Sequence, residues 1–337
     1  MNFHKFKNDF KPSNWTKYFL IFSASFILIG AIILMALGFN LGMDFTGGNI
    51  VKIESNQSIT TVEYNEIVKV ANDVLREQGL SLSQAQIEGE SGAQSVSIQY
   101  QNKAGTDDMT EINNAVITAL TAELPQYDVQ NAETKSATAS SELLTNALIA
   151  VFVALIFMLV YIAIRFEFLS GIAALVTLFH DVLIMCAFVL IFRVEINSAF
   201  VAAIITVLGY SINNTIVIFD RVRENLQKPS LEKLSNQEIA DLSVKQTLNR
   251  TLNTALTTLV AIFILALIGV PQMSEFVVPI LIGLIAGTYS SIFIAAPLWT
   301  KMMAKNSKYG IRQKAKLKAE KLQEEGVVDT SSTTINE

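Results

Sequence analysis

A histidine and an aspartate stand next to each other, as His180 and Asp181, in the apolar stretch LVTLFHDVLIMC. Ionisable side chains are rare inside a membrane span and usually have a function there. At a rise of 1.5 Å per residue from Ser170, the pair lies about fifteen ångströms into the hydrocarbon. Two interpretations follow: a proton relay or water-filled path between spans, or an interhelical hydrogen-bond clamp that holds Asp181 neutral.

Two adjacent amides, Asn213 and Asn214, interrupt a second apolar stretch, LGYSINNTIVIFDRVREN. Amides donate and accept hydrogen bonds but do not titrate. Gly209 and Asn213 share one face of the expected helix, and this spacing permits close contact with a neighbouring helix. We expect the amides to orient water, a carboxylate on a neighbouring span, or each other.

Arg250 begins the fifth apolar run, in LNRTLNTALTTLV, where Thr257 is one of several side chains that bring hydroxyls and amides into the membrane. In one interpretation Arg250 snorkels to the cytoplasmic interface. In the other it is a cation that controls the charge of a nearby acid. Asp220, Arg221 and Arg223, in FDRVREN, are typical of a positive anchor at that interface.

Motifs for other kinds of chemistry are absent from the sequence. The chain has two histidines and one cysteine, with no cluster suited to zinc, and no P-loop, dinucleotide or serine-hydrolase motif. We therefore expect no metal, no cofactor and no enzymatic activity. An intramembrane aspartyl protease would need two facing acids, and Asp181 alone is well inside a span. The single cysteine, Cys186, predicts that there is no intrachain disulfide.

The stretch MDFTGGN bears glycines, as phosphate-binding loops do, but a strand is expected after it, and phosphate binding uses a helix N-terminus. We interpret Gly47 and Gly48 as a turn. Asp44 and Phe45 precede this turn and belong to the same short stretch.

Membrane spans must hold these side chains. The chain has 337 residues, 51% of them hydrophobic, and a mean hydropathy of +0.42, which is too apolar for an ordinary soluble domain. About 20 apolar residues cross a bilayer as a helix. Six runs reach this length: Tyr18–Gly38, Leu143–Ile164, Ser170–Phe192, Ser198–Phe219, Leu252–Val270 and Phe276–Trp299.

Lysine and arginine concentrate on one side of these spans, which predicts that both termini are cytoplasmic and that residues 39–142 are extracytoplasmic. The net charge of −5 hides this division, because the long outer segment is acidic. The basic residues follow the membrane topology, so we expect no binding to nucleic acid.

The outer segment has the pattern of alternating strands and amphipathic helices. The strand GGNIVKIES precedes a helix with a Thr60–Glu63 capping box and a stop at Gly79. The strands QAQIEGE and AQSVSIQY follow, joined at Ser91-Gly92, then a helix capped by Thr106 and the strand YDVQNAE. The order β-α-β-β-α-β predicts a ferredoxin-like α+β domain with one open sheet face, which could bind a peptide or a partner.

The expected fold is thus a polytopic α-helical membrane protein, with six transmembrane helices and a ferredoxin-like domain between spans one and two. We divide the chain into a cytoplasmic N-terminus (1–17), a first transmembrane helix (18–38), the outer domain with a polar linker at Thr134–Glu142 (39–142), a five-helix bundle (143–299) and a basic, largely disordered cytoplasmic tail (300–337).

Together these stretches resemble the SecF family, a branch of the resistance-nodulation-division superfamily. LGMDFTGGNIV, with Asp44, Phe45, Gly47 and Gly48, is similar to the family's D-F-T-G-G motif before the outer domain. FHDV, GYSINNTIVIFDRVREN and NRTLNTALTTL are similar to its third, fourth and fifth spans. The resemblance covers nearly the whole chain.

The resemblance implies a function in the bacterial plasma membrane. SecF proteins pair with SecD beside the SecYEG channel, where the SecA ATPase acts on the same preproteins, and use the proton gradient to assist translocation. Lipid, SecD, SecYEG and the preprotein in transit are the implied partners.

One position departs from the family pattern G-Y-S-[IL]-N-D-[ST], whose aspartate is the suggested proton carrier. Asn214 stands there, and an amide cannot supply a change of charge. Three explanations are open: SecD retains its own acid, Asp181 takes over, or the sequence is a variant with this aspartate replaced. We expect the first. The alternative functions are a small-molecule exporter of the same superfamily and a scaffold for membrane-protein insertion that uses no gradient.

Overall fold

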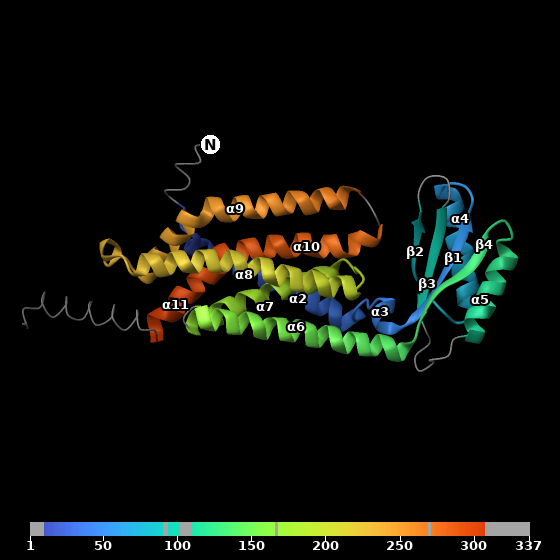
Figure 1. The fold of residues 1–337 in the computed structure, drawn as a ribbon, viewed down its shortest axis with the longest axis horizontal. Coiled ribbons are helices and arrows are strands. Elements are labelled where there is room, and N and C mark those ends of the chain that lie inside the picture. Colours follow the sequence, from blue (N-terminus) through green and yellow to red (C-terminus); the bar gives the residue numbers. More distant parts are fainter. Residues whose placement is uncertain (1–9, 90–93, 102–109, 166–167, 269–270, 307–337) are drawn as a thin grey trace, which may run out of the picture.

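The computed structural model describes residues 10–89, 94–101, 110–165, 168–268 and 271–306. A bundle of long helices and a small α/β domain lie end to end in an elongated molecule (Figure 1). Two predicted features, the Ser91-Gly92 turn and the Thr106 cap, lie outside the described residues, as does the tail beyond Asn306.

Six described helices are long and apolar enough to cross a membrane, which confirms the six predicted spans. They are α2 (Pro12–Leu37), α6 (Ala137–Arg165), α7 (Phe168–Ile191), α8 (Ser198–Leu226), α9 (Asn236–Ile268) and α10 (Pro271–Ser290), the last continued by a π-helical turn (Ser291–Ala295) and α11 (Ala296–Asn306). About half of the apolar segment in α7, α8 and α10 is buried, against almost none in α2, α6 and α9. The core of the bundle is therefore the packing of α7, α8 and α10.

One predicted segment was wrong, and one helix extends beyond its predicted span. The linker predicted at Thr134–Glu142 is mostly helical, since α6 begins at Ala137 and its small polar residues satisfy the backbone: Ser136 Oγ accepts from the Ala139 N–H at 3.2 Å. The helix that contains the fifth predicted span, α9, begins at Asn236 and so extends the apolar run Leu252–Val270 on its N-terminal side. Ser235 and Glu238 form a reciprocal capping box at its start.

The outer domain has the predicted ferredoxin-like order. Its elements are β1 (Gly48–Ser55), α4 (Thr61–Glu77), β2 (Leu82–Glu88), β3 (Gln94–Gln101), α5 (Thr110–Glu123) and β4 (Asp128–Lys135). The strands form one antiparallel sheet in the order β2-β3-β1-β4. The capping box of Thr60 and Glu63 is present, and Gly79 follows α4 at φ +68°, as predicted.

The two helices cover one face of this sheet and leave the other toward the bundle (Figure 1). Alternate residues of the central strands are buried against α4 and α5, among them Val51, Ile53, Ile98 and Tyr100. On the opposite face, the Gln84 side chain donates to Glu275 and the Gln101 side chain donates to the Leu41 carbonyl, both in the membrane-proximal region. The open face predicted from the sequence therefore lies against the bundle.

Helix α2 is held against α7 by a close backbone approach at Gly30. A Cβ added to Gly30 would lie 2.7 Å from Ala187 Cα, a distance that side-chain rotation cannot relieve. Gly209 on α8 is different, because a Cβ there would meet nothing within 4 Å. The two glycines form a matched pair of test positions.

We predict that Gly30→Ala destabilises the chain by about 1–3 kcal/mol, because α2 and α7 must separate. Gly209→Ala should be neutral or slightly stabilising, since alanine is favoured over glycine inside a helix. Thermal unfolding of both variants in detergent measures the difference. Equal unfolding midpoints for the two would contradict this description of the α2–α7 contact.

Candidate functional site

Asp181 lies at the centre of a buried hydrogen-bond network. Its side chain is fully buried in α7. One carboxylate oxygen is 2.9 Å from His180 Nδ1, and the other accepts from Ser211 Oγ, on α8, at 2.5 Å. Both oxygens thus have partners, as a buried carboxylate requires.

The network extends from His180 to two further helices. Tyr289 Oη, on α10, is 3.3 Å from His180 Nε2, and it is 2.9 Å from Ser23 Oγ, on α2. The Tyr289 ring also meets the His180 ring edge-on, with centroids 5.6 Å apart. Asp181, His180, Ser211, Tyr289 and Ser23, called here the Asp181 network, therefore join α7, α8, α10 and α2.

Reasoning from the sequence missed Ser23 and Tyr289. Each lies in an apolar run with other small or hydroxyl-bearing residues beside it, and the spacing within one helix does not say which side chains of another helix it meets. A weak signal was available, because a hydroxyl in the middle of a span needs a hydrogen-bond partner.

A second group of hydroxyls joins α8 and α10 beside this network. Thr215 Oγ1 is 2.9 Å from Ser291 Oγ, which also donates to the Gly287 carbonyl at 2.7 Å. The two helices approach closely at Gly287, which has no side chain. A Cβ added there would lie 2.9 Å from Ser211 Cβ. Ser291 is the first residue of the π-helical turn, a feature that often occurs at functional positions.

The two adjacent asparagines of α8 lie in different surroundings. Asn214 is 3% exposed, and its Nδ2 has no hydrogen-bond partner among the residues that the structure describes. Asn213 is exposed on the surface of α8, as is Gly209 one turn before it. The amides therefore do not act as one site, although Gly209 and Asn213 share a face as predicted.

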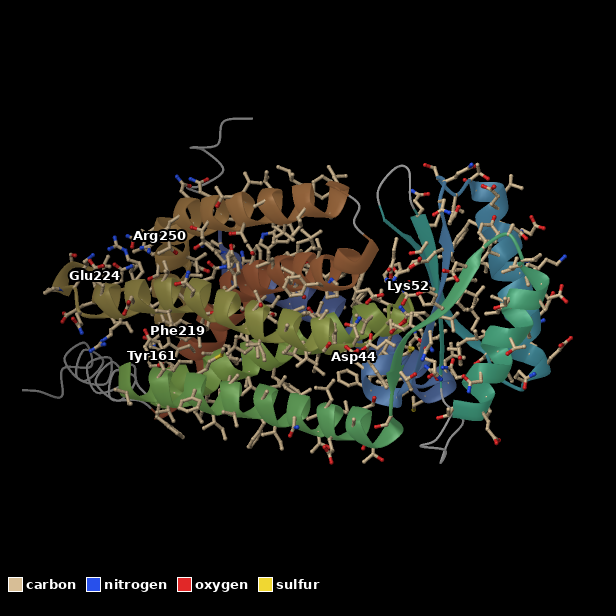
Figure 2. All side chains as sticks on the ribbon, turned by 45° about the vertical axis from the view of Figure 1, so that its right-hand side comes forward. Asp44, Lys52, Tyr161, Phe219, Glu224 and Arg250 are labelled. Carbon is tan, nitrogen blue, oxygen red and sulfur yellow. The ribbon has the colours of Figure 1, made fainter. Side chains whose placement is uncertain are left out.

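Arg250 and Thr257 are exposed on α9 rather than joined to Asp181. Thr257 Oγ1 donates to the carbonyls of Asn253 and Thr254 in its own helix. Figure 2 shows Arg250 near the end of the bundle that lies away from the outer domain, toward Glu224. This position fits the interfacial interpretation of Arg250, and the buried acid of the bundle, Asp181, bonds to His180 and Ser211.

The charged end of α8 forms local pairs. Arg221 bonds to Glu224 at 2.5 Å and to Gln246 of α9 at 2.5 Å, while Lys228 contacts Glu224 at 2.8 Å. Asp220 and Arg223 are exposed beside them. Such local ion pairs among exposed charges are typical of a helix end at a membrane interface.

The glycine-rich stretch before β1 is a short helix followed by a turn. In α3 (Met43–Thr46), Phe45 packs into the membrane-side core. Gly47 has φ +74°, and a Cβ at Gly48 would lie 2.4 Å from the Tyr100 carbonyl oxygen, so both positions need glycine. Asp44 contacts Lys135 and the N-terminus of α8.

No group of three metal-ligating side chains lies within the described parts of the chain. The site is thus an arrangement of carboxylate, imidazole, phenol, hydroxyl and amide groups inside a helix bundle. These groups can exchange protons and reorganise hydrogen bonds between helices. The fold and site together define a six-helix membrane protein with an outer ferredoxin-like domain and a buried polar network.

Comparison with known proteins identifies the family. Residues 115–305, more than half of the chain, match the family described as "Protein export membrane protein SecD/SecF, C-terminal", and residues 32–59 match the SecD/SecF GG motif. The chain belongs to the SecD/SecF family.

Several relatives match most of this chain. The protein translocase subunit SecF of Sebaldella termitidis is 35% identical, with 86% of this chain and 91% of that protein covered. The protein translocase subunit SecDF of Bacillus subtilis is 34% identical over 84% of this chain. The crystal structure of SecDF from Thermus thermophilus, described as a translocon-associated membrane protein, is 29% identical, with a TM-score of 0.70 over 88% of this chain.

The chain spans 37% of the length of the Bacillus subtilis SecDF and 39% of the Thermus thermophilus one. It is therefore similar to a part of these longer proteins, and to nearly all of the SecF subunit from Sebaldella termitidis.

We predict that Ser211→Ala destabilises the chain by about 1–3 kcal/mol, because it leaves one oxygen of a buried carboxylate without its donor. Ser290→Ala is the matched control: Ser290 is equally buried, but its hydroxyl bonds to the Gly287 carbonyl of its own helix. Chemical unfolding in mixed micelles measures both. If Ser290→Ala lowered the free energy of unfolding as much as Ser211→Ala, the interhelical bond to Asp181 would not stabilise the chain more than a bond within one helix.

Proposed function

We propose that this chain is a SecF-type subunit that, together with a SecD partner, assists translocation of preproteins through SecYEG across the bacterial plasma membrane and draws on the proton gradient. It acts there as a translocase subunit rather than as an enzyme. Family membership and the names of its relatives, protein translocase subunits, support the Sec pathway. The buried Asp181 network is the observation that supports coupling to protons.

Asp181 is the proton carrier of this subunit in our proposal. It is a fully buried ionisable group at the meeting point of the core helices, whereas Asn214 cannot titrate. Losing or gaining a proton at its carboxylate would change the bonds to His180 and Ser211 together, and therefore the fit of α7 against α8. An acid retained in SecD, which the sequence led us to expect, remains a second carrier and lies outside this chain.

His180 and Tyr289 extend the path by which a proton could reach Asp181. Imidazole both accepts and donates protons near neutral pH, and a phenol can pass one along a hydrogen-bond chain. Ser23 anchors this chain to α2, at 2.9 Å from the Tyr289 hydroxyl. In our proposal His180 and Tyr289 relay the proton and Ser23 positions Tyr289, while Asp181 holds the proton.

A line of small and polar residues on α8 supports pairing with a second membrane half. Thr206, Gly209 and Asn213 are exposed and spaced three or four residues apart, so they form one stripe, called here the α8 seam. Hydrocarbon cannot hydrogen-bond to the Asn213 amide, and a partner helix can. The two halves of the complex would thus meet along this seam, with both termini of the chain on the cytoplasmic side.

We predict that Asp181→Asn removes the stimulation of translocation by the proton gradient in vesicles that hold SecYEG, SecA, SecD and this chain. Asparagine keeps the size of the side chain and one accepting oxygen but cannot change charge. Asp73→Asn, at an exposed position on α4, is the control that should retain full stimulation.

Other results would favour other functions. Full stimulation with Asp181→Asn would assign the coupling to SecD alone, and Asn214→Asp would then be worth comparing. If collapse of the proton gradient did not change translocation by the unaltered complex, the result would support a scaffold function that uses no gradient. Normal secretion with raised drug susceptibility in a deletion strain would support the exporter.

We predict that Gly209→Leu weakens co-purification with SecD by about tenfold or more, because a large side chain would hold the partner helix away from the α8 seam. In the chain alone Gly209 is exposed, and an added Cβ there would meet nothing within 4 Å. Ala24→Leu, on the exposed face of α2, adds the same bulk elsewhere and should leave pairing intact. Equal recovery of SecD with both variants would place the interface on another helix.

A further inference from the structure

The outer domain meets the membrane bundle through a compact set of polar side chains, called here the outer junction. They come from α3, from strands β2 and β4 of the outer domain, from the loop between α7 and α8, and from the outer ends of α8 and α10. The set consists of Asp44, Gln84, Lys135, Glu195, Asn197, Ser198 and Glu275. Figure 2 shows Asp44 where the bundle and the outer domain meet.

The first part of the junction is an ion pair with a helix end. Asp44 Oδ1 accepts from Lys135 Nζ, the last residue of β4, at 2.8 Å. Asp44 Oδ2 accepts from the Ser198 backbone N–H at 3.0 Å, and from its hydroxyl, at the start of α8. Burial alone would raise the pKa of Asp44, but the bonds from Lys135 and Ser198 outweigh it and lower the pKa. Asp44 therefore stays charged at neutral pH.

The second part is a pair of glutamates. Glu275, near the start of α10, accepts from Gln84 Nε2 of β2 at 2.9 Å and from the Asn197 amide. Glu195 accepts a backbone hydrogen bond from Met43 at the start of α3. It is also packed onto Gly42, where an added Cβ would lie 2.1 Å from Glu195 Oε1. Glu275 thus bridges the bundle and the outer domain, while Glu195 contacts the segment that leads from α2 through α3 into the outer domain.

The charges around Glu195 make it sensitive to pH. The charged groups that act on it are Glu275, from α10, and Asp44, from α3. Burial raises the pKa of Glu195 to about 7, and repulsion from Glu275 and Asp44 adds to the rise. The bond from the Met43 N–H opposes the rise without cancelling it.

We propose that the outer junction is a pH-dependent latch between the outer domain and the membrane bundle. When Glu195 is protonated, the outer domain docks on the outer ends of α8 and α10. When Glu195 is ionised, its repulsion of Glu275 and Asp44 loosens the docked state. Asp44 with Lys135 remains a constant tether. The latch does not depend on the proposed role in translocation.

The direction of the effect follows from the raised pKa of Glu195. A proton binds this carboxyl more tightly in the docked state than in a free chain, where the ordinary value is 4.5. Docking is therefore strongest below that ordinary value, and the contribution of Glu195 is lost as the pH rises through about 7. The outer domain should be more tightly docked in acid than in mild alkali.

The test measures the distance between the two parts of the full-length chain in lipid nanodiscs. Spin labels are attached to Val62→Cys, on α4, and Ala36→Cys, at the outer end of α2, with Cys186→Ala removing the natural thiol. We expect one narrow distance distribution at about pH 5.5 and an added, broader population at about pH 8.5, on either side of the Glu195 pKa.

Three variants decide the outcome. Glu195→Gln should give the narrow distribution at both pH values, and Glu275→Gln should move the transition to lower pH by removing a like charge. Glu77→Gln, at an exposed position on α4, should behave as the unaltered chain. The latch is overturned by a pH-independent distance in the unaltered chain, by opening in acid, or by a pH response that survives in Glu195→Gln.

Discussion

A carboxylate inside a membrane must have hydrogen-bond partners, because neither water nor lipid can replace them there. This requirement organises the core of the bundle around Asp181. Its two oxygens bond to His180 and Ser211, and His180 in turn contacts Tyr289. The three most buried helices, α7, α8 and α10, each contribute to this network, and Ser23 adds α2.

Close helix contact is the condition for these short bonds, and the glycines of α10 provide it. A Cβ at Gly283 would lie 2.5 Å from a Val207 methyl group, and one at Gly287 would meet Ser211. A carboxylate with hydrogen-bond partners also connects the outer domain to the bundle: Asp44 bonds to Lys135, in β4, and to the N-terminus of α8. Helix α8 therefore connects the outer domain at its start, the Asp181 network in its middle and the group of local ion pairs at its end.

Much of the fold could be predicted from the sequence, because hydropathy reports lipid contact and strand alternation reports a sheet face. The six spans, the order of the outer domain and the Thr60–Glu63 box are examples. The helical start of α6 could not be predicted from the sequence, because the Thr134–Glu142 segment has the small polar composition of a linker. Hydropathy also cannot say which helices adjoin, so Ser23 and Tyr289 were missed, and Arg250 was weighed as a partner of an acid.

The central claim is that Asp181 exchanges a proton inside the bundle. Infrared difference spectroscopy of the full-length chain in lipid, recorded during a pH titration, tests it most directly, because a buried carboxyl group has a separate band when protonated. We predict a titrating band that shifts in frequency with Ser211→Ala, which removes its hydrogen-bond donor, and disappears with Asp181→Asn. A spectrum in which Asp181→Asn removes no titrating carboxyl band would contradict the claim.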